Sequence, residues 1–251
     1  MNNQSAISEE EVQAVDFFHD FIIYLSYLDN NPIKRTITGN ISLKDIQEMS
    51  KLFREQEVFE EYKKFGWKIT TEPQIQFLTQ IKIIAEVMRL TYKRKGKVLL
   101  SKNGKGYLQN INATTQYWSM VLYFWKRVNW TYFTPTKEVN ELSVVDILQE
   151  KQNIIWQALL KKGENWIDFS VLCQTLKNYF HLHPYYYDET HGGFFLHLDM
   201  ELALIKRNLA LFGCIEYEEE KTEHMLERII RIKPTKIGLF MFSKALYESY
   251  L

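Results

Sequence analysis

The sequence predicts a mainly α-helical protein with small β-hairpins, organised as two tandem modules of similar layout that an aromatic helix bridges. Apolar residues recur at three- and four-residue spacing along most of the chain, which is typical of packed helices. Twice a long apolar helix is followed by two short β-like runs, and twice this hairpin ends in a Ser/Thr-x-x-Gly sequence. With 251 residues and a hydrophobic share of 46%, the chain has room for one large domain or two domains of ordinary size.

The first module is expected over residues 15–111, after an acidic lead over residues 1–14 that carries three glutamates. Its first helix is predicted at 15–28, because apolar and aromatic side chains repeat there at helical spacing. Ser42 is expected to cap a second helix, and a third, short helix is predicted at 58–65.

The main element of the first module is a long apolar helix at 71–90 that leads into a basic hairpin. The Thr-Thr-Glu-Pro sequence at 70–73 is typical of a helix start, since a hydroxyl caps free N–H groups and proline suits the first turn. The hairpin is predicted within 90–101, with Gly96 at its turn. The stretch 89–105 holds seven basic residues and no acidic residue, which makes it the most positive part of the chain.

The second module is expected over residues 112–251 and opens with a strongly aromatic helix that begins at Thr114 or Thr115. An aromatic stripe of this kind has two interpretations, a membrane anchor or a core helix between the modules. The apolar stretch from Tyr117 to Trp125 is much shorter than the roughly 18 residues that a membrane helix needs. We therefore expect a core helix and no membrane partner.

Capping residues, glycine stops and apolar spacing predict the remaining elements of the second module. Its hairpin has the opposite charge to the first, because the stretch 214–227 contains six glutamates and one lysine. We expect phosphate to repel this hairpin, and we expect the second module to serve protein interaction or self-association instead. The predicted elements are helices at 143–163, 170–180 and 199–213, strands at 214–217 and 229–232, and a last helix from 236.

The two hairpins end in matching sequences. When Ser-Lys-Asn-Gly at 101–104 is aligned with Thr-Lys-Ile-Gly at 235–238, Val98 falls on Ile232. A hydroxyl at the end of the last strand can cap the next helix, and the glycine lets that helix start close to the sheet. The sequence at 36–39 is a third, more degenerate instance. The repeat predicts that the chain contains one kind of structural unit twice.

These motifs resemble those of uncharacterised bacterial proteins with tandem winged-helix modules, including those grouped with a plasmid-borne ORF-three-like family. The matching stretches are Thr-x-x-Gly-Asn-Ile at 36–41, Leu-Ser-x-x-Gly at 100–104 and Asn-Trp at 129–130. Ser101 stands where this family usually has threonine, and the C-terminal zinc-binding cysteine cluster is missing. The resemblance implies two winged-helix modules, a variety of helix-turn-helix, and it brings no catalytic residues.

The basic hairpin is the best candidate for a functional site. We expect it to contact the phosphates of duplex DNA, while the helix before it lies toward a groove. The protein would then be a DNA-binding or transcription-regulatory protein. The alternative is a solvated hairpin balanced by nearby acids, in a scaffold whose modules bind protein and not DNA. The residues expected to contact nucleic acid are Lys82, Arg89, Lys93, Arg94, Lys95, Lys97, Lys102 and Lys105.

Other chemistry finds little support in the sequence. No phosphate-binding glycine loop, nucleophile elbow, zinc-protease pair or dinucleotide fingerprint occurs, so we expect no enzyme and no cofactor. The two cysteines are too few for a disulfide framework. No secretory signal is apparent, so a cytoplasmic protein is expected. Four histidines lie close together in the sequence, at His181, His183, His191 and His197, and a metal site is one interpretation of them. Their spacing is not that of a metal motif, so we expect scattered surface and core histidines and no metal site.

Overall fold

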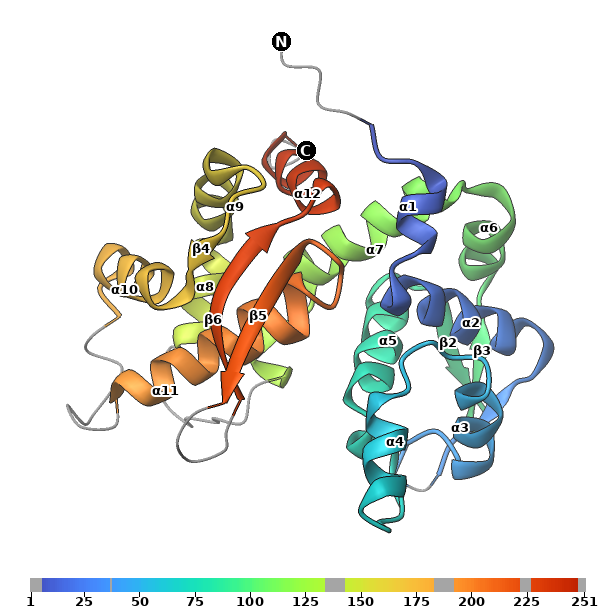
Figure 1. The fold of residues 1–251 in the computed structure, drawn as a ribbon. Helices are drawn as coiled ribbons and strands as arrows, with labels where there is room; N and C mark the ends of the chain where they lie inside the picture. The colour runs from blue at the N-terminus through green and yellow to red at the C-terminus, as the bar shows by residue number, and fades with distance from the viewer. Residues whose placement is uncertain (1–5, 37, 134–142, 183–191, 222–226, 248–251) are drawn as a thin grey trace. The chain divides into compact units, whose positions relative to one another are not determined.

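The computed structural model describes residues 6–36, 38–133, 143–182, 192–221 and 227–247. Within these ranges the protein is mainly helical and has two small antiparallel sheets of three strands each, which confirms the predicted class (Figure 1). The chain divides into two compact units. We call them the N-terminal unit, Ser8–Val128, and the C-terminal unit, which consists of Asn129–Leu251 together with Met1–Ile7.

The N-terminal unit places one three-stranded sheet among its helices. Serine or asparagine side chains cap several helices by accepting a backbone N–H, as Ser8, Ser42 and Asn112 do. Its elements are α1 (Glu9–Gln13), α2 (Asp16–Asn30), β1 (Ile33–Lys34), α3 (Leu43–Ser50), α4 (Glu57–Lys64), the 3₁₀ turn η1 (Glu72–Gln74), α5 (Gln76–Val87), β2 (Thr91–Arg94), β3 (Lys97–Leu100), α6 (Lys102–Asn110) and α7 (Ala113–Arg127).

Two expectations for this part of the chain are corrected, and one helix is found that was not predicted. The helix predicted at 71–90 is interrupted, because Ile75 has φ −109° and ψ 84° and separates η1 from α5. The aromatic helix begins earlier than expected, since Asn112 caps it and not Thr114 or Thr115. The acidic lead is partly helical, because Ser8 and Glu11 form a capping box that starts α1.

The aromatic helix α7 belongs to the core of the N-terminal unit, where it packs against α1 and α5. Tyr117 and Trp125 are fully buried, and the ring of Tyr117 meets Phe18 of α2 edge to face at 5.6 Å. The unit therefore extends to Val128, beyond the boundary expected between residues 111 and 112. Among the described residues, no helix is long and apolar enough to cross a membrane.

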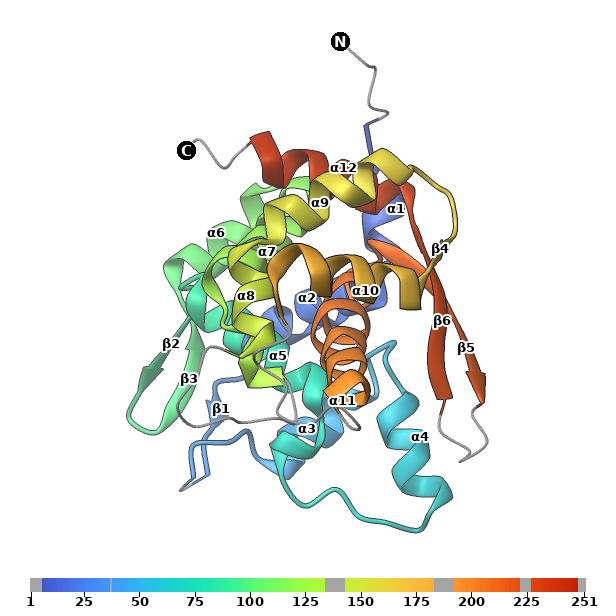
Figure 2. The same cartoon turned by 90° about the vertical axis from the view of Figure 1, so that its left-hand side faces the viewer.

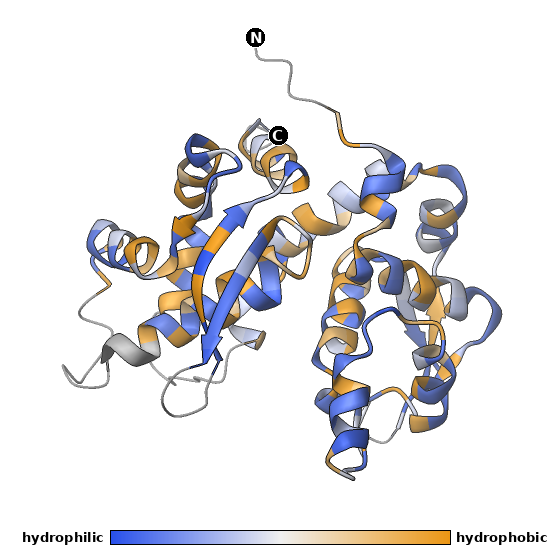
Figure 3. Cartoon of the chain, in the orientation of Figure 1, coloured by the Kyte–Doolittle hydropathy of each residue, from blue (hydrophilic) through white to orange (hydrophobic). Residues whose placement is uncertain are grey.

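The C-terminal unit repeats this general plan. Its core includes Trp156 of one helix, which stacks on Phe242 of the last helix at 5.1 Å. In Figure 3 both helices carry apolar residues, drawn in orange, among polar ones. The elements are the 3₁₀ turn η2 (Trp130–Phe133), α8 (Val144–Glu150), α9 (Gln152–Lys162), β4 (Ile167–Asp168), α10 (Phe169–Phe180), α11 (Gly192–Asp199), the π-helix η4 (Met200–Leu209), β5 (Ile215–Lys221), β6 (Glu227–Pro234) and α12 (Lys236–Tyr247).

Two predicted helices of this unit have different bounds in the structure. The helix expected at 143–163 is two helices, because Lys151 leaves the helical conformation between α8 and α9. The helix expected at 199–213 starts earlier, with α11, and continues as a π-helix in which Ala210 donates to the carbonyl of Ile205. Five-residue spacing brings Glu201 beside Lys206, and their ion pair of 2.8 Å fits this wider helix.

Each unit contains, in chain order, a helix, a short strand, further helices, a hairpin and a helix. The hairpin strands are antiparallel in both units, as predicted, and the short strand joins the second hairpin strand in both sheets. The strand orders are therefore the same, β1-β3-β2 and β4-β6-β5 (Figures 1 and 2). Ile33 pairs with Val98 in one sheet, and Ile167 pairs with Ile232 in the other, which supports the alignment of Val98 with Ile232.

Candidate nucleic-acid interface

The candidate interface is built on the junction between the first hairpin and α6. The backbone N–H of Ser101 donates to the carbonyl of Leu90 at 2.8 Å. Its hydroxyl donates to the carbonyl of Arg89 at 2.8 Å and accepts the N–H of Gly104 at 3.0 Å. One residue thus closes the base of the hairpin and caps the next helix.

The C-terminal unit has the same junction, with threonine in place of serine. The N–H of Thr235 donates to the carbonyl of Cys214 at 3.0 Å. Its hydroxyl donates to the carbonyl of Gly213 at 2.7 Å and accepts the N–H of Gly238 at 3.0 Å. All the hydrogen bonds of the first junction recur, so the repeated sequence is a repeated structure.

The glycine of each junction is needed for space. A Cβ on Gly238 would overlap the carbonyl oxygen of Cys214 and would lie 2.7 Å from its carbonyl carbon. A Cβ on Gly104 would overlap the carbonyl oxygen of Leu90 and would lie 2.9 Å from Cγ of Leu100. Both helices therefore start against a backbone carbonyl that only glycine can approach.

The third instance of the motif, at 36–39, is a different structure. The N–H of Gly39 donates to the carbonyl of Thr36, and the N–H of Asn40 donates to the Thr36 hydroxyl. Gly39 has a φ of +86°, which closes a turn that brings Arg35 opposite Ile41. No helix follows directly, so this turn is not a third copy of the strand-to-helix junction.

The outer face of the first sheet carries a row of three cations. Lys34 of β1 lies opposite Lys97 of β3, which in turn lies opposite Arg94 of β2. Directly opposite residues in antiparallel strands project to the same side, so all three side chains share one face. All three are exposed, and within the described ranges none of them forms an ion pair. We call Lys34, Arg94 and Lys97 the cationic row.

The equivalent row of the second sheet has alternating charge. Asp168 of β4 lies opposite Arg231 of β6, which lies opposite Glu218 of β5. Arg231 donates two hydrogen bonds to Glu218, at 2.6 and 2.8 Å. This hydrogen bonding keeps the pKa of Glu218 below its ordinary value.

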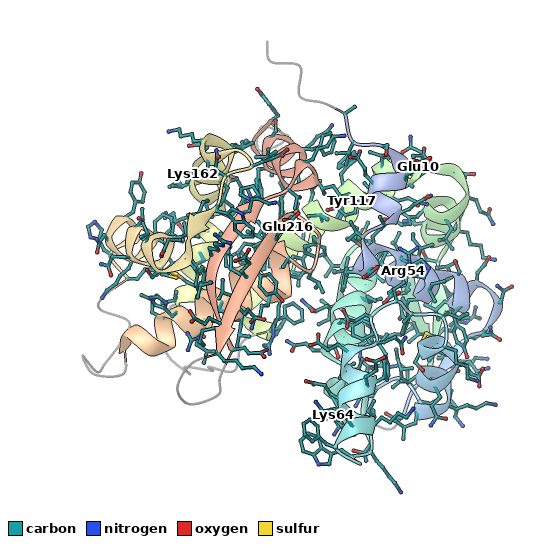
Figure 4. The ribbon with its side chains drawn as sticks, in the orientation of Figure 1. Glu10, Arg54, Lys64, Tyr117, Lys162 and Glu216 are labelled. Atoms are coloured by element: carbon teal, nitrogen blue, oxygen red, sulfur yellow. The ribbon has the colours of Figure 1, made fainter. Side chains whose placement is uncertain are left out.

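The second hairpin is therefore less acidic than its first strand suggests. Lys233 pairs with Glu216 at 2.6 Å, further along the same two strands (Figure 4). Lys206 of η4 pairs with Glu219 at 2.5 Å. Although burial lowers the pKa of Lys206, hydrogen bonds to Glu201 and Glu219 raise it overall. The negative charge expected for 214–227 counted only the residues of that stretch. Basic residues of β6 and η4, which lie outside it, pair with several of its glutamates.

Backbone conformation marks two more cations of the first hairpin. Lys95 and Gly96 form its two-residue turn, with φ values of 48° and 70°. Arg89 has a φ of 57° and occupies the place that Gly213, with φ 66°, holds in the other junction. Left-handed conformations favour glycine and asparagine, so lysine and arginine stand here at some loss of stability.

Three of the predicted contact residues have acidic partners. Lys82 forms an ion pair with the buried Glu72, which also accepts the N–H of Ile41. This lysine is part of the internal structure and is removed from the candidate surface. Lys93 pairs with Glu86 at 2.8 Å, and Lys105 pairs with Asp29 at 3.1 Å; these pairs are partly exposed and place the two lysines beside acids.

The remaining candidates lie at the two ends of the hairpin. Arg94, Lys95 and Lys97 are exposed at its turn, whereas Arg89 and Lys102 are exposed at its base. Helix α5, which precedes the hairpin, has no exposed residue from Gln76 to Val87. Its two charged residues, Lys82 and Glu86, both form the ion pairs described above. The candidate surface is therefore the sheet face and the hairpin, and α5 adds no unpaired cation to it.

Lys34 is the functional candidate that sequence reasoning missed. It belongs to a two-residue strand far from the hairpin along the chain, and only its pairing with Lys97 brings it into the cationic row. The signal available in the sequence was the extended basic pair Lys34-Arg35, which could have been matched to the hairpin by its β-like character.

Among the residues that the structure describes, no group of three or more histidine, cysteine or acidic side chains could hold a metal ion. His183 and His191 lie outside the described residues. Burial, and secondarily Arg228, lowers the pKa of His197. Cys173 is buried, and burial raises the pKa of its thiol.

Comparisons with known proteins add no relative: no family model matches the chain, and no curated protein or solved structure matches it significantly.

Proposed function

We propose that this protein is a non-enzymatic DNA-binding protein, regulatory in role, made of two winged-helix modules. The first module contacts the phosphates of duplex DNA through the cationic row and the hairpin turn. The shared order of helix, strand, helices and hairpin supports this assignment, because the hairpin then corresponds to the wing of each module. The contacts are to phosphates, so they position the protein on DNA and do not by themselves select a sequence.

The observation that carries the proposal is the difference between the two equivalent rows. Like charges directly opposite one another destabilise a sheet, by roughly 0.2–1 kcal/mol for each pair. The second sheet avoids this with Asp168, Arg231 and Glu218, so the fold itself does not require three cations. A polyanion bound along the first row would relieve the repulsion that the free protein carries.

The left-handed cations support the same conclusion. Lys95 and Arg89 occupy backbone positions where glycine or asparagine is less strained. Neither has an ion-pair partner among the described residues. Their charges lie at the turn and at the base of one hairpin, and they extend the positive surface along it in both directions.

The test compares two double neutralisations that remove the same charge. Arg94→Gln with Lys97→Gln is expected to weaken binding to a labelled random-sequence duplex about tenfold or more at low salt. The slope of log affinity against log salt should fall by about 2, one for each lost phosphate contact. Lys161→Gln with Lys162→Gln, at the exposed end of α9, should leave both quantities unchanged (Figure 4). Equal effects of the two variants, or no duplex binding by the unaltered protein, would refute the proposal.

A protein-binding role of the C-terminal unit is the second candidate. Its helix α10 exposes Val171 and Tyr179, which lie two helical turns apart on one side with Thr175 between them. Sedimentation of the full chain should then show self-association, or a pull-down should capture a partner protein. The double variant Val171→Ser with Tyr179→Ser should abolish that interaction. A strict monomer at all concentrations and no partner in a pull-down would remove this second role.

A further inference from the structure

The end of α4 forms a second surface with its own character. The segment Lys63-Lys64-Phe65-Gly66-Trp67-Lys68, which we call the aromatic tip, lies at the opposite end of the N-terminal unit from α1 and α6 (Figures 1 and 2). Phe65 is 55% exposed and Trp67 is 63% exposed, although both are large apolar residues. No residue of α4 itself is buried. The tip therefore projects from the unit without a covering element among the described residues.

The two rings of the tip are held in a fixed arrangement. The N–H of Gly66 donates to the carbonyl of Lys63, and the N–H of Trp67 donates to the carbonyl of Tyr62. This is the hydrogen-bond pattern that ends many helices, with glycine at its left-handed position and φ of 67°. It turns the chain back so that Trp67 stacks on Phe65, with ring centroids 4.9 Å apart and planes 27° apart.

Helix termination explains only part of this arrangement. A hydrophobic contact between Trp67 and Tyr62 is usual in such a terminus, and the rings do meet edge to face at 5.9 Å. The contact leaves most of Trp67 in solvent, and it does not account for Phe65. The stacked pair thus presents an aromatic face that the fold does not use.

The tip is also positive. Lys63, Lys64 and Lys68 are exposed and have no ion-pair partner among the described residues. The amine of Lys64 lies 5.6 Å from the centre of the Phe65 ring. The acids of α4 precede the tip: Glu57 and Glu60 lie in the first turn of the helix, and Glu61 follows them. Three cations thus surround two stacked rings within six residues.

We propose that the aromatic tip binds single-stranded nucleic acid, with a base stacked on the Trp67–Phe65 pair and flanking phosphates held by the three lysines. Alternation of aromatic and cationic groups matches the alternation of bases and phosphates along a strand. The site is separate from the cationic row and would take unpaired bases, whereas the row takes duplex phosphates. It therefore does not depend on the proposed function of the sheet.

An anionic membrane is the other ligand that lysines and tryptophan suggest. The glutamates of α4 argue against it, because a flat anionic surface would repel Glu57, Glu60 and Glu61 together. Within the tip, the large exposed apolar side chains are two neighbouring rings, and the remaining exposed face of α4 is charged. A single strand needs to reach only the tip.

The experiment is a titration of the full chain with a short labelled oligothymidylate, followed by anisotropy and by tryptophan fluorescence. Trp67→Leu and Phe65→Leu should each weaken binding about tenfold, since loss of one stacking platform has an effect of this size. Lys63→Gln with Lys64→Gln and Lys68→Gln should weaken it and flatten its salt dependence. Tyr132→Leu, which removes a similarly exposed ring from η2, is the matched control and should bind as the unaltered protein does.

Three results would overturn the inference. The first is binding of oligothymidylate by Trp67→Leu with unaltered affinity, and the second is no binding of oligothymidylate by the unaltered protein. The third is a shift of tryptophan emission with phosphatidylglycerol vesicles that Trp67→Leu abolishes, without any shift with the oligonucleotide, which would assign the tip to a lipid surface. Duplex affinity should be unchanged in the tip variants, so failure here and failure of the proposed duplex site can be distinguished.

Discussion

The two sheets of this protein have the same strand order and register, but the equivalent rows of side chains on their outer faces differ in charge. In the N-terminal unit, Lys34, Lys97 and Arg94 lie side by side. In the C-terminal unit the same places hold an acid, a base and an acid. One fold thus accepts either arrangement, and the repulsive arrangement is the one that calls for a functional explanation.

What the two units keep in common lies inside them. Ile33 and Ile167 are buried at equivalent positions of the short strands, and Val98 and Ile232 are buried opposite them. The strand-to-helix junction is equivalent in every hydrogen bond described above. Buried packing and backbone hydrogen bonds tolerate little change, whereas exposed side chains can change with function.

The largest expected effect concerns the junction glycines. Gly238→Ala should destabilise the C-terminal unit by about 3 kcal/mol or more, because the three atoms nearest to the new Cβ are backbone atoms of Cys214. Gly104→Ala should have a smaller effect of about 1–3 kcal/mol, since part of the overlap is with the movable Leu100 side chain. Urea unfolding of both variants measures the difference.

Gly106→Ala is the control for these variants. Gly106 lies inside α6, and a methyl group added to it would have only Nδ2 of Asn110 nearby, at 3.8 Å. The substitution should stabilise the protein by about 0.5–1 kcal/mol through helix propensity. Similar losses for all three glycine variants would contradict the account of the junctions.

The junction hydroxyls come next. Ser101→Ala and Thr235→Ala should each destabilise their unit by about 1–2 kcal/mol, because each removes a helix cap and a hydrogen bond to the hairpin base. Ser101→Thr should be nearly neutral, since threonine makes the same bonds in the other unit. Thermal unfolding provides the measurement, and a loss for Ser101→Thr as large as for Ser101→Ala would show that the junctions are not equivalent.

Substitutions of Arg89 and Lys95, the two cations with positive φ, test whether these residues reduce stability and strengthen duplex binding. Arg89→Gly copies Gly213, and Lys95→Asn supplies a residue that tolerates a positive φ. Each should stabilise the N-terminal unit by about 1 kcal/mol and at the same time weaken duplex binding. The measurements are unfolding and anisotropy on the same variants. Greater stability with unchanged duplex affinity would remove both residues from the interface.

The smallest effect is a pH response of the C-terminal unit. Burial lowers the pKa of His197 in the folded protein, so the unfolded chain binds a proton more readily. Stability should therefore fall as the pH drops below the unfolded value of about 6.5 and should level off below the folded pKa. Urea unfolding at a series of pH values should show this slope, and His197→Asn should reduce it. An unchanged slope in the variant would assign the response to other groups.

Local signals were sufficient for much of the fold. The cap at Ser42, both hairpins and the repeated junction were predicted because their hydrogen bonds join residues close together in the sequence. The break at Lys151 and the π-helix were not predicted. Both interrupt a continuous apolar pattern, so their positions depend on how the helices pack and not on a local stop signal.

The candidate site was predicted only in part, for a similar reason. Arg94, Lys95 and Lys97 lie close together in the sequence, and they remain exposed together at the hairpin turn. Lys82 left the candidate surface because Glu72 comes from a separate turn of the chain, and Lys34 joined it because β1 pairs with β3. Partners brought from other segments cannot be inferred from spacing alone.

The amino-acid sequence by itself determined the positions of most helices, the two hairpins and the doubled junction, because caps, turns and glycines act over a few residues. Only the tertiary structure decided which charges meet a partner. Strand pairing set three cations side by side in one unit and placed Arg231 between Asp168 and Glu218 in the other. Electrostatic interactions depend on distance in space, and the fold alone sets those distances.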